Sequence, residues 1–181
     1  MVGYSEVQLS GPGLRSYLDA LAASRPTGRT ILARFSALNT DAEWFGTQTN
    51  LRKFSAFRDF LGNPAVRAAL PQLLAEDPLP IGTPPPFDEV PSGVLTLDGE
   101  FAWLLIEGGA YGKFSGTHAQ AKILASSAVQ DLVGDRYEDY RAFWSPEPWS
   151  SFFDDVAWDV TWILVNVRLR EVTIFCSMDS D

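Results

Sequence analysis

The chain is organised around two apolar runs near its C-terminus, Val160-Thr-Trp-Ile-Leu-Val165 and Val172-Thr-Ile-Phe-Cys176. In the first run both alternating sets of side chains are largely apolar, which is typical of an interior strand covered on both faces. We predict a hairpin with one arm from Trp158 to Val165, a turn over residues 166–170 and a second arm from Glu171 to Met178. The C-terminus is therefore expected to belong to the core.

Helical patterns precede this hairpin. Thr117-His-Ala-Gln120 is a capping box, and the apolar residues after it recur at helical spacing up to a stop at Gly134. The same spacing predicts a helix over residues 13–24 and a helical hairpin over 50–61 and 64–75, in which Pro71 must kink or split the second helix. For Phe101–Ile106, which ends at Gly108-Gly109, a short helix is favoured over a strand.

Strand signals complete the pattern. Glu6–Leu9 is a candidate edge strand, residues 30–38 alternate as a strand, and Val94–Leu97 is strand-like with a turn at Asp98-Gly99. Residues 78–91 hold six of the twelve prolines and predict a loop or stiff linker, the best candidate for an internal boundary. We expect a single α+β domain over residues 1–181, mainly an antiparallel sheet with a C-terminal hairpin packed by several helices.

The charge of the chain restricts its partners. The formal net charge is −9, and residues 131–181 carry eleven acids against four arginines. This argues against direct binding to nucleic acid and favours a basic protein partner. The single cysteine, Cys176, cannot form an intramolecular disulfide, and neither a signal peptide nor an apolar run of membrane-spanning length is present in the sequence. We therefore expect a cytoplasmic protein with no membrane partner.

Motifs for catalysis are absent from the sequence. The only histidine, His118, falls in the first turn of a predicted helix, where a surface position is expected. Gly108-Gly-Ala-Tyr-Gly112 has the glycines of a phosphate-binding turn but lacks the full motif, so a simple loop is the favoured interpretation. We expect no enzyme activity, no catalytic residue and no cofactor.

A cluster of acids and tryptophans near the C-terminus is the candidate site. Tryptophan is enriched in binding hot spots, and complementary charge selects a partner. The predicted partner-binding residues are Asp154, Asp155, Asp159, Asp179, Asp181, Trp149 and Trp144, with Trp158 beside them. The alternative is a metal- or small-ligand-binding enzyme, because Asp159, Asp179 and Asp181 would meet at the open end of the hairpin and carboxylates bind Mg²⁺ or Ca²⁺.

Four segments carry a resemblance to a known group of proteins. They are Gly108-Gly-Ala-Tyr111, Phe114-Ser-Gly-Thr117, Trp149-Ser-Ser-Phe-Phe-Asp-Asp-Val-Ala-Trp-Asp-Val-Thr161 and Ser177-Met-Asp-Ser-Asp181. In these segments the C-terminal half resembles small acidic bacterial immunity proteins of polymorphic toxin systems, of the contact-dependent inhibition and type VI secretion kind. The resemblance implies a cytoplasmic, non-enzymatic protein that binds one cognate toxin domain and occludes its active site. A basic nuclease would suit the acidic composition.

Overall fold

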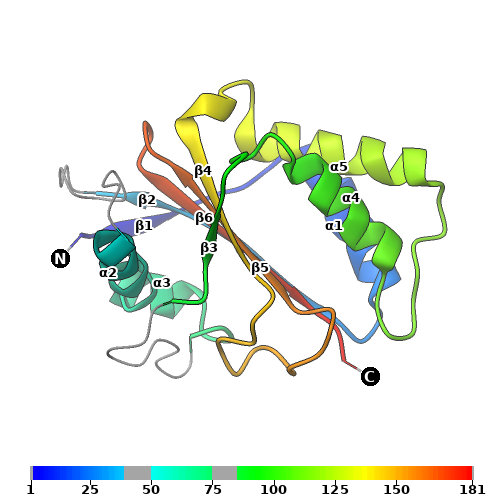
Figure 1. Cartoon of the computed structure of the whole chain (residues 1–181), viewed down its shortest axis with the longest axis horizontal. Coiled ribbons are helices and arrows are strands. Elements are labelled where there is room, and N and C mark those ends of the chain that lie inside the picture. Colours follow the sequence, from blue (N-terminus) through cyan, green and yellow to red (C-terminus); the bar gives the residue numbers. More distant parts are fainter. Residues whose placement is uncertain (1, 39–49, 75–84, 181) are drawn as a thin grey trace.

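An antiparallel β-sheet forms the centre of the protein (Figure 1). The computed structural model describes residues 2–38, 50–74 and 85–180. Within these residues the sheet has six strands, in the spatial order β1 (Tyr4–Val7), β2 (Arg29–Ala37), β6 (Glu171–Met178), β5 (Val160–Asn166), β4 (Tyr140–Ser145) and β3 (Asp88–Val90). The predicted fold class is confirmed, and the parts of the chain on either side of residues 78–91 both contribute strands to this sheet.

The predicted C-terminal hairpin forms the two inner strands. β5 pairs with β6 in the register Val165↔Val172 and Trp162↔Phe175. Every residue of β5 is buried, and so is every residue of β6 except Glu171. The apolar character of both faces of this hairpin therefore reflects a sheet that is covered on two sides.

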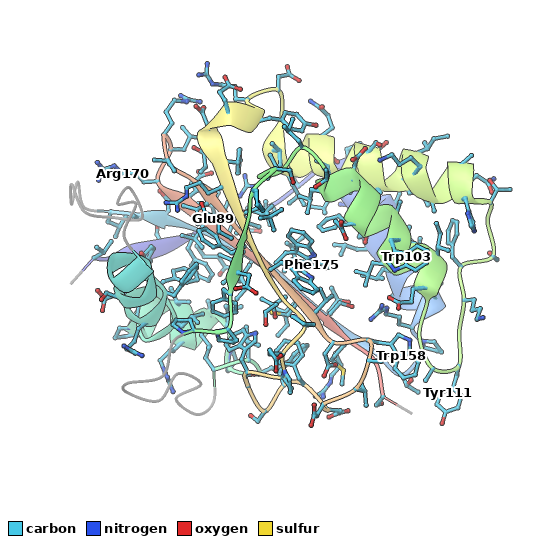
Figure 2. All side chains as sticks on the ribbon, viewed as in Figure 1. Glu89, Trp103, Tyr111, Trp158, Arg170 and Phe175 are labelled. Carbon is cyan, nitrogen blue, oxygen red and sulfur yellow. The ribbon has the colours of Figure 1, made fainter. Side chains whose placement is uncertain are left out.

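Two helical layers cover the sheet. Helices α1 (Pro12–Ser24), α4 (Leu97–Glu107) and α5 (His118–Val133) lie on one face, and α2 (Asn50–Leu61) and α3 (Pro64–Ala69) lie on the other (Figure 1). Alternate residues of the inner strands divide between these layers, as the two-residue period of a strand requires. Ile174 packs in the core under α2 and α3, whereas Phe175 points toward α4 (Figure 2) and packs against Phe101, with ring centroids 5.1 Å apart and the rings tilted by 35°.

Local signals placed several helices correctly. The Thr117 hydroxyl accepts a hydrogen bond from the Gln120 backbone N–H at 3.2 Å, and the Gln120 side chain accepts one from the Thr117 N–H at 2.7 Å. This capping box begins α5 where it was predicted. α3 ends at Ala69, two residues before Pro71, so the proline ends this helix and does not kink it.

Two local predictions were wrong. Residues 94–97 do not form a strand: Val94 is buried in a turn, and α4 begins at Leu97, which places Asp98-Gly99 in its first turn. Burying Val94 and Leu97 against the α1–α5 layer outweighs the strand propensity of the segment. Within the predicted loop over residues 78–91, Asp88–Val90 is the short edge strand β3, and residues 75–84 lie outside the described residues.

Among the described residues, no helix has both the length and the apolar content needed to cross a membrane.

Candidate functional site

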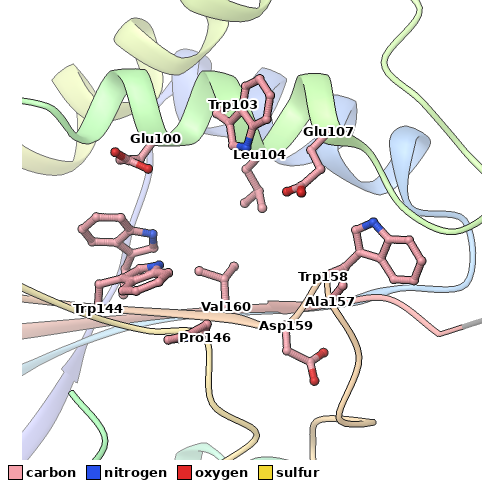
Figure 3. A pocket seen from close by; sticks show the side chains of 11 residues that line it. Glu100, Trp103, Leu104, Glu107, Trp144, Pro146, Ala157, Trp158, Asp159 and Val160 are labelled. Carbon is pink, nitrogen blue, oxygen red and sulfur yellow. The ribbon is translucent and has the colours of Figure 1, made fainter. Parts of the chain in front are cut away.

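A pocket of about 310 Å³ opens between α4 and one end of the sheet (Figure 3). Its walls come from α4, from the ends of β4 and β5, and from the loop that joins these strands. We call it the tryptophan pocket, and its lining residues are Glu100, Trp103, Leu104, Glu107, Trp144, Pro146, Ala157, Trp158, Asp159, Val160 and Trp162.

Helix α4 supplies one wall of the pocket, because its lining residues recur at helical spacing. Trp103 and Leu104 lie three and four residues after Glu100, and Glu107 lies four and three residues after them, which places all four along one side of the helix. Leu104 is buried and belongs to the core beneath the pocket. Trp103 remains 57% exposed although it is a large aromatic residue. The wall therefore carries one exposed indole between two carboxylates.

The sheet supplies the opposite wall. Trp144 on β4 and Trp162 on β5 are cross-strand partners, so their side chains lie next to each other on the face that α4 covers. Val160 shares this face because it lies two residues before Trp162. Trp162 is buried and forms part of the floor, whereas Trp144, near the edge of the sheet, is 36% exposed. Trp158 and Ala157 close the far end (Figure 3).

The pocket is negatively charged. Neither Glu100 nor Glu107 makes an ion pair with any residue in the described ranges, and no lysine or arginine lines the pocket. A nearby acid on the same helix behaves differently, since Asp98 pairs with the Lys122 ammonium at 2.7 Å. Neither glutamate is therefore held by an ion pair, although the charge of Glu107 also acts on the buried Arg25.

A buried arginine lies behind the pocket. Arg25, directly after α1, is 3% exposed, and its Nη1 donates a hydrogen bond to the Trp158 carbonyl at 2.8 Å. Its Nε and Nη2 have no hydrogen-bond partner in the described part of the chain. Burial lowers the pKa of the Arg25 guanidinium, and the charges of Glu107 and Asp179 oppose this effect most strongly. Through its hydrogen bond to the Trp158 carbonyl, Arg25 fixes the backbone that carries Trp158.

Asp179 is buried in the same region. One carboxylate oxygen accepts a hydrogen bond from the Thr27 hydroxyl at 2.7 Å, and the other accepts one from the Ala110 backbone N–H at 2.8 Å. Gly109 allows this approach, because a Cβ atom there would lie 1.8 Å from the second oxygen. The glycine-rich loop after α4 therefore receives a carboxylate of the chain itself, and Asp179 joins three distant segments.

Asp159 stabilises the loop that precedes β5. It is 4% exposed, and one carboxylate oxygen accepts a hydrogen bond from the Val156 backbone N–H at 3.1 Å. The other oxygen has no partner among the described residues, and burial raises the pKa of this carboxyl. Figure 3 shows the carboxylate pointing away from α4. Asp159 thus contributes to the shape of the pocket end, while its charge faces away from α4.

The predicted site residues are divided among several places. Of those that the structure describes, Trp144 and Asp159 line the pocket. Trp149 is buried in the core on the opposite face of the sheet, where its indole N–H donates to the Thr161 hydroxyl at 2.8 Å. Asp154 and Asp155 are exposed in the β4–β5 loop, and Asp154 lies 3.6 Å from Arg29. Asp179 is fully buried, and Asp181 lies outside the described residues.

Asp159 and Asp179 were predicted to lie close together and to offer carboxylate ligands to a metal ion. In the structure both lie near the buried Arg25. Both carboxylates act on the pKa of Arg25, so the positive charge near them is a guanidinium of the chain. Within the described residues, no group of three or more His, Cys, Asp or Glu side chains is arranged to hold a metal ion. Nothing in the segment Ser24-Arg25-Pro26 signalled that this arginine would be buried.

Sequence reasoning missed the α4 wall of the pocket. Glu100, Trp103 and Glu107 become a group only when the helix begins at Leu97, and the strand predicted over residues 94–97 concealed that start. Trp162 was predicted to lie in the core; it is buried there, and it also forms the floor of the pocket. A scan against protein-family models and a search of curated proteins each gave no match to this chain.

Proposed function

We propose that the chain is an immunity-type protein, which binds one cognate bacterial toxin domain and neutralises it without catalytic activity of its own. The observation that carries this proposal is the tryptophan pocket, in which exposed Trp103 and Trp144 lie beside the unpaired carboxylates of Glu100 and Glu107. Tryptophan is enriched among the hot-spot residues of protein interfaces, and unpaired surface charge selects a partner of opposite sign.

The charge of the whole chain supports a basic partner. A formal charge of −9 on 181 residues attracts a cationic domain over distances up to about 10 Å at moderate salt. A nuclease toxin needs a cationic surface to bind the phosphates of its substrate. An acidic protein that covers this surface would block the substrate, and the resemblance of the C-terminal half to immunity proteins, which includes the pocket loop, points the same way.

The test is co-expression with the toxins encoded beside this chain. The cognate toxin domain alone should stop growth, and the toxin together with this protein should permit it. Purified partners should form a stable complex by size exclusion and calorimetry. Failure of the chain to bind or protect against any neighbouring toxin domain would refute the proposal.

Two variants locate the surface. Glu100→Lys reverses an exposed charge at the pocket and should weaken the complex and slow association at low salt. Glu6→Lys makes the same change on β1, at the opposite edge of the sheet, and serves as the matched control. Equal effects of the two changes would remove the pocket from the interface while leaving the immunity function itself intact.

A further inference from the structure

We infer that the tryptophan pocket takes one arginine side chain of a protein partner. That the arginine belongs to a toxin domain rests on the proposed function. That the pocket recognises an arginine rests on the pocket alone. The volume of about 310 Å³ lies at the lower limit of ligand sites, which span roughly 300–1,000 Å³. A pocket of this size suits a single large side chain better than an extended ligand.

The lining selects a cation. Four indoles contribute to the walls and floor, and the π face of an indole attracts a positive charge within about 6 Å of the ring. Glu100 and Glu107 add two unpaired carboxylates. Arg25 lies behind the pocket, and the charges of Glu107, Asp179 and Asp159 act on it. Because Glu100 adds a further carboxylate, the acids of this region outnumber its one arginine and the local formal charge is negative.

The planar shape of the guanidinium favours arginine over lysine. A guanidinium stacks flat on an aromatic ring while its N–H groups pair with a carboxylate at the ring edge, whereas a lysine ammonium is a compact and strongly hydrated charge. Glu100 and Glu107 lie two helical turns apart, about 10 Å along α4, with Trp103 between them. A stacked guanidinium can therefore reach one carboxylate without leaving the indole.

The same chain contains this arrangement elsewhere. Arg141 lies over the ring of Phe143 at 5.3 Å from its centroid and pairs with Glu89 at 2.8 Å. Arg29 lies over Phe152 at 5.1 Å and near Asp154 at 3.6 Å. In both places a guanidinium combines an aromatic face with a carboxylate. The tryptophan pocket offers the same two groups and supplies no arginine of its own.

The test is a titration of the purified full chain with a short blocked peptide, acetyl-Gly-Arg-Gly-amide, followed by the indole N–H signals in two-dimensional NMR. The signals of Trp103, Trp144 and Trp158 should shift together, with a dissociation constant on the order of millimolar, because one side chain makes few contacts. Trp149, in the core on the other face of the sheet, is the internal control and should not shift.

Two comparisons decide the chemistry. Glu100→Gln and Trp103→Ala should each weaken binding of the arginine peptide by about fivefold or more, as expected for loss of one charged or cation–π contact, while Glu6→Gln should not. The lysine peptide and tetramethylammonium should bind more weakly than the arginine peptide. Tighter binding of either one, an equal shift at Trp149, or no shift at the pocket indoles would overturn the inference.

The outcome is separable from that of the proposed function. The peptide titration needs no toxin. If the indole signals of the pocket do not shift, arginine recognition is refuted, while a co-expressed toxin can still be neutralised. Conversely, a pocket that binds the arginine peptide in a chain that protects against no toxin supports the recognition chemistry and refutes the immunity function. Thermal unfolding of each variant, unchanged from the parent chain, shows that a loss of binding is not a loss of fold.

Discussion

Replacing Asp179 by alanine is expected to destabilise the protein by about 3–5 kcal/mol, the usual cost of removing one member of a buried charged group. The Asp179 carboxylate is fully buried and accepts hydrogen bonds from the Thr27 hydroxyl at 2.7 Å and the Ala110 N–H at 2.8 Å. Its charge also offsets the burial of the Arg25 guanidinium. The substitution removes these interactions and leaves the Ala110 N–H without its hydrogen-bond partner, whereas the Thr27 hydroxyl can still donate to the Ser180 carbonyl at 2.8 Å.

The hydrogen bonds account for part of this magnitude. A hydrogen bond to a charged group contributes about 1.5–3 kcal/mol, and the Ala110 N–H loses its bond entirely. The rest comes from the Arg25 guanidinium, which stays buried with less negative charge near it. The free energy of unfolding of a native domain is about 5–15 kcal/mol, so the variant should lose a large fraction of its stability.

Urea denaturation, followed by circular dichroism, measures the change directly. The unfolding midpoint should fall with little change in slope, and the melting temperature should drop by about 6–20 °C. Asp179→Asn, which keeps an acceptor but loses the charge, should give an intermediate loss. Asp154→Ala removes an exposed carboxylate 3.6 Å from Arg29 and should stay within about 0.5 kcal/mol of the parent chain. A loss below about 1 kcal/mol for Asp179→Ala would refute the structural role assigned to this residue.

Three further predictions concern single positions. Burial raises the pKa of the Asp159 carboxyl above its value in the unfolded chain. The free energy of unfolding should therefore increase as the pH falls from the folded pKa to the unfolded pKa. Asp159→Asn should abolish this increase in urea titrations across pH, and it should not destabilise the chain at pH 7. Gly109→Ala would place a Cβ atom 1.8 Å from an Asp179 oxygen and should destabilise by about 1–3 kcal/mol, whereas Gly99→Ala, in α4 with its nearest neighbour at 3.8 Å, should stabilise by about 0.4–1 kcal/mol; chemical denaturation compares the two. Burial raises the pKa of the Cys176 thiol to about 12, so a thiol reagent at pH 8 should modify it only in denaturant, and rapid modification of the native protein would contradict its burial.

Local signals in the sequence specified most of the elements. The capping box at Thr117, the helical spacing after it and the two-faced apolar pattern of Val160–Val165 each depend on neighbouring residues, so they were readable without the fold. These signals also predicted an α+β domain with an antiparallel sheet, and the structure agrees. The start of α4 was misplaced, because Val94 and Leu97 owe their conformation to burial against distant helices.

The candidate site depended on tertiary structure. The carboxylates at the end of the hairpin looked alike in the sequence, yet Asp179 is buried by Thr27 and Ala110, which are more than sixty residues away from it. Arg25 is likewise buried by segments distant in sequence, and no local pattern predicts the burial of a charge. The sequence alone therefore determined most of the helices, the inner C-terminal hairpin and an excess of negative charge. Tertiary packing decided which acids became structural and which remained beside the exposed tryptophans, because burial depends on what the distant parts of the chain bring together.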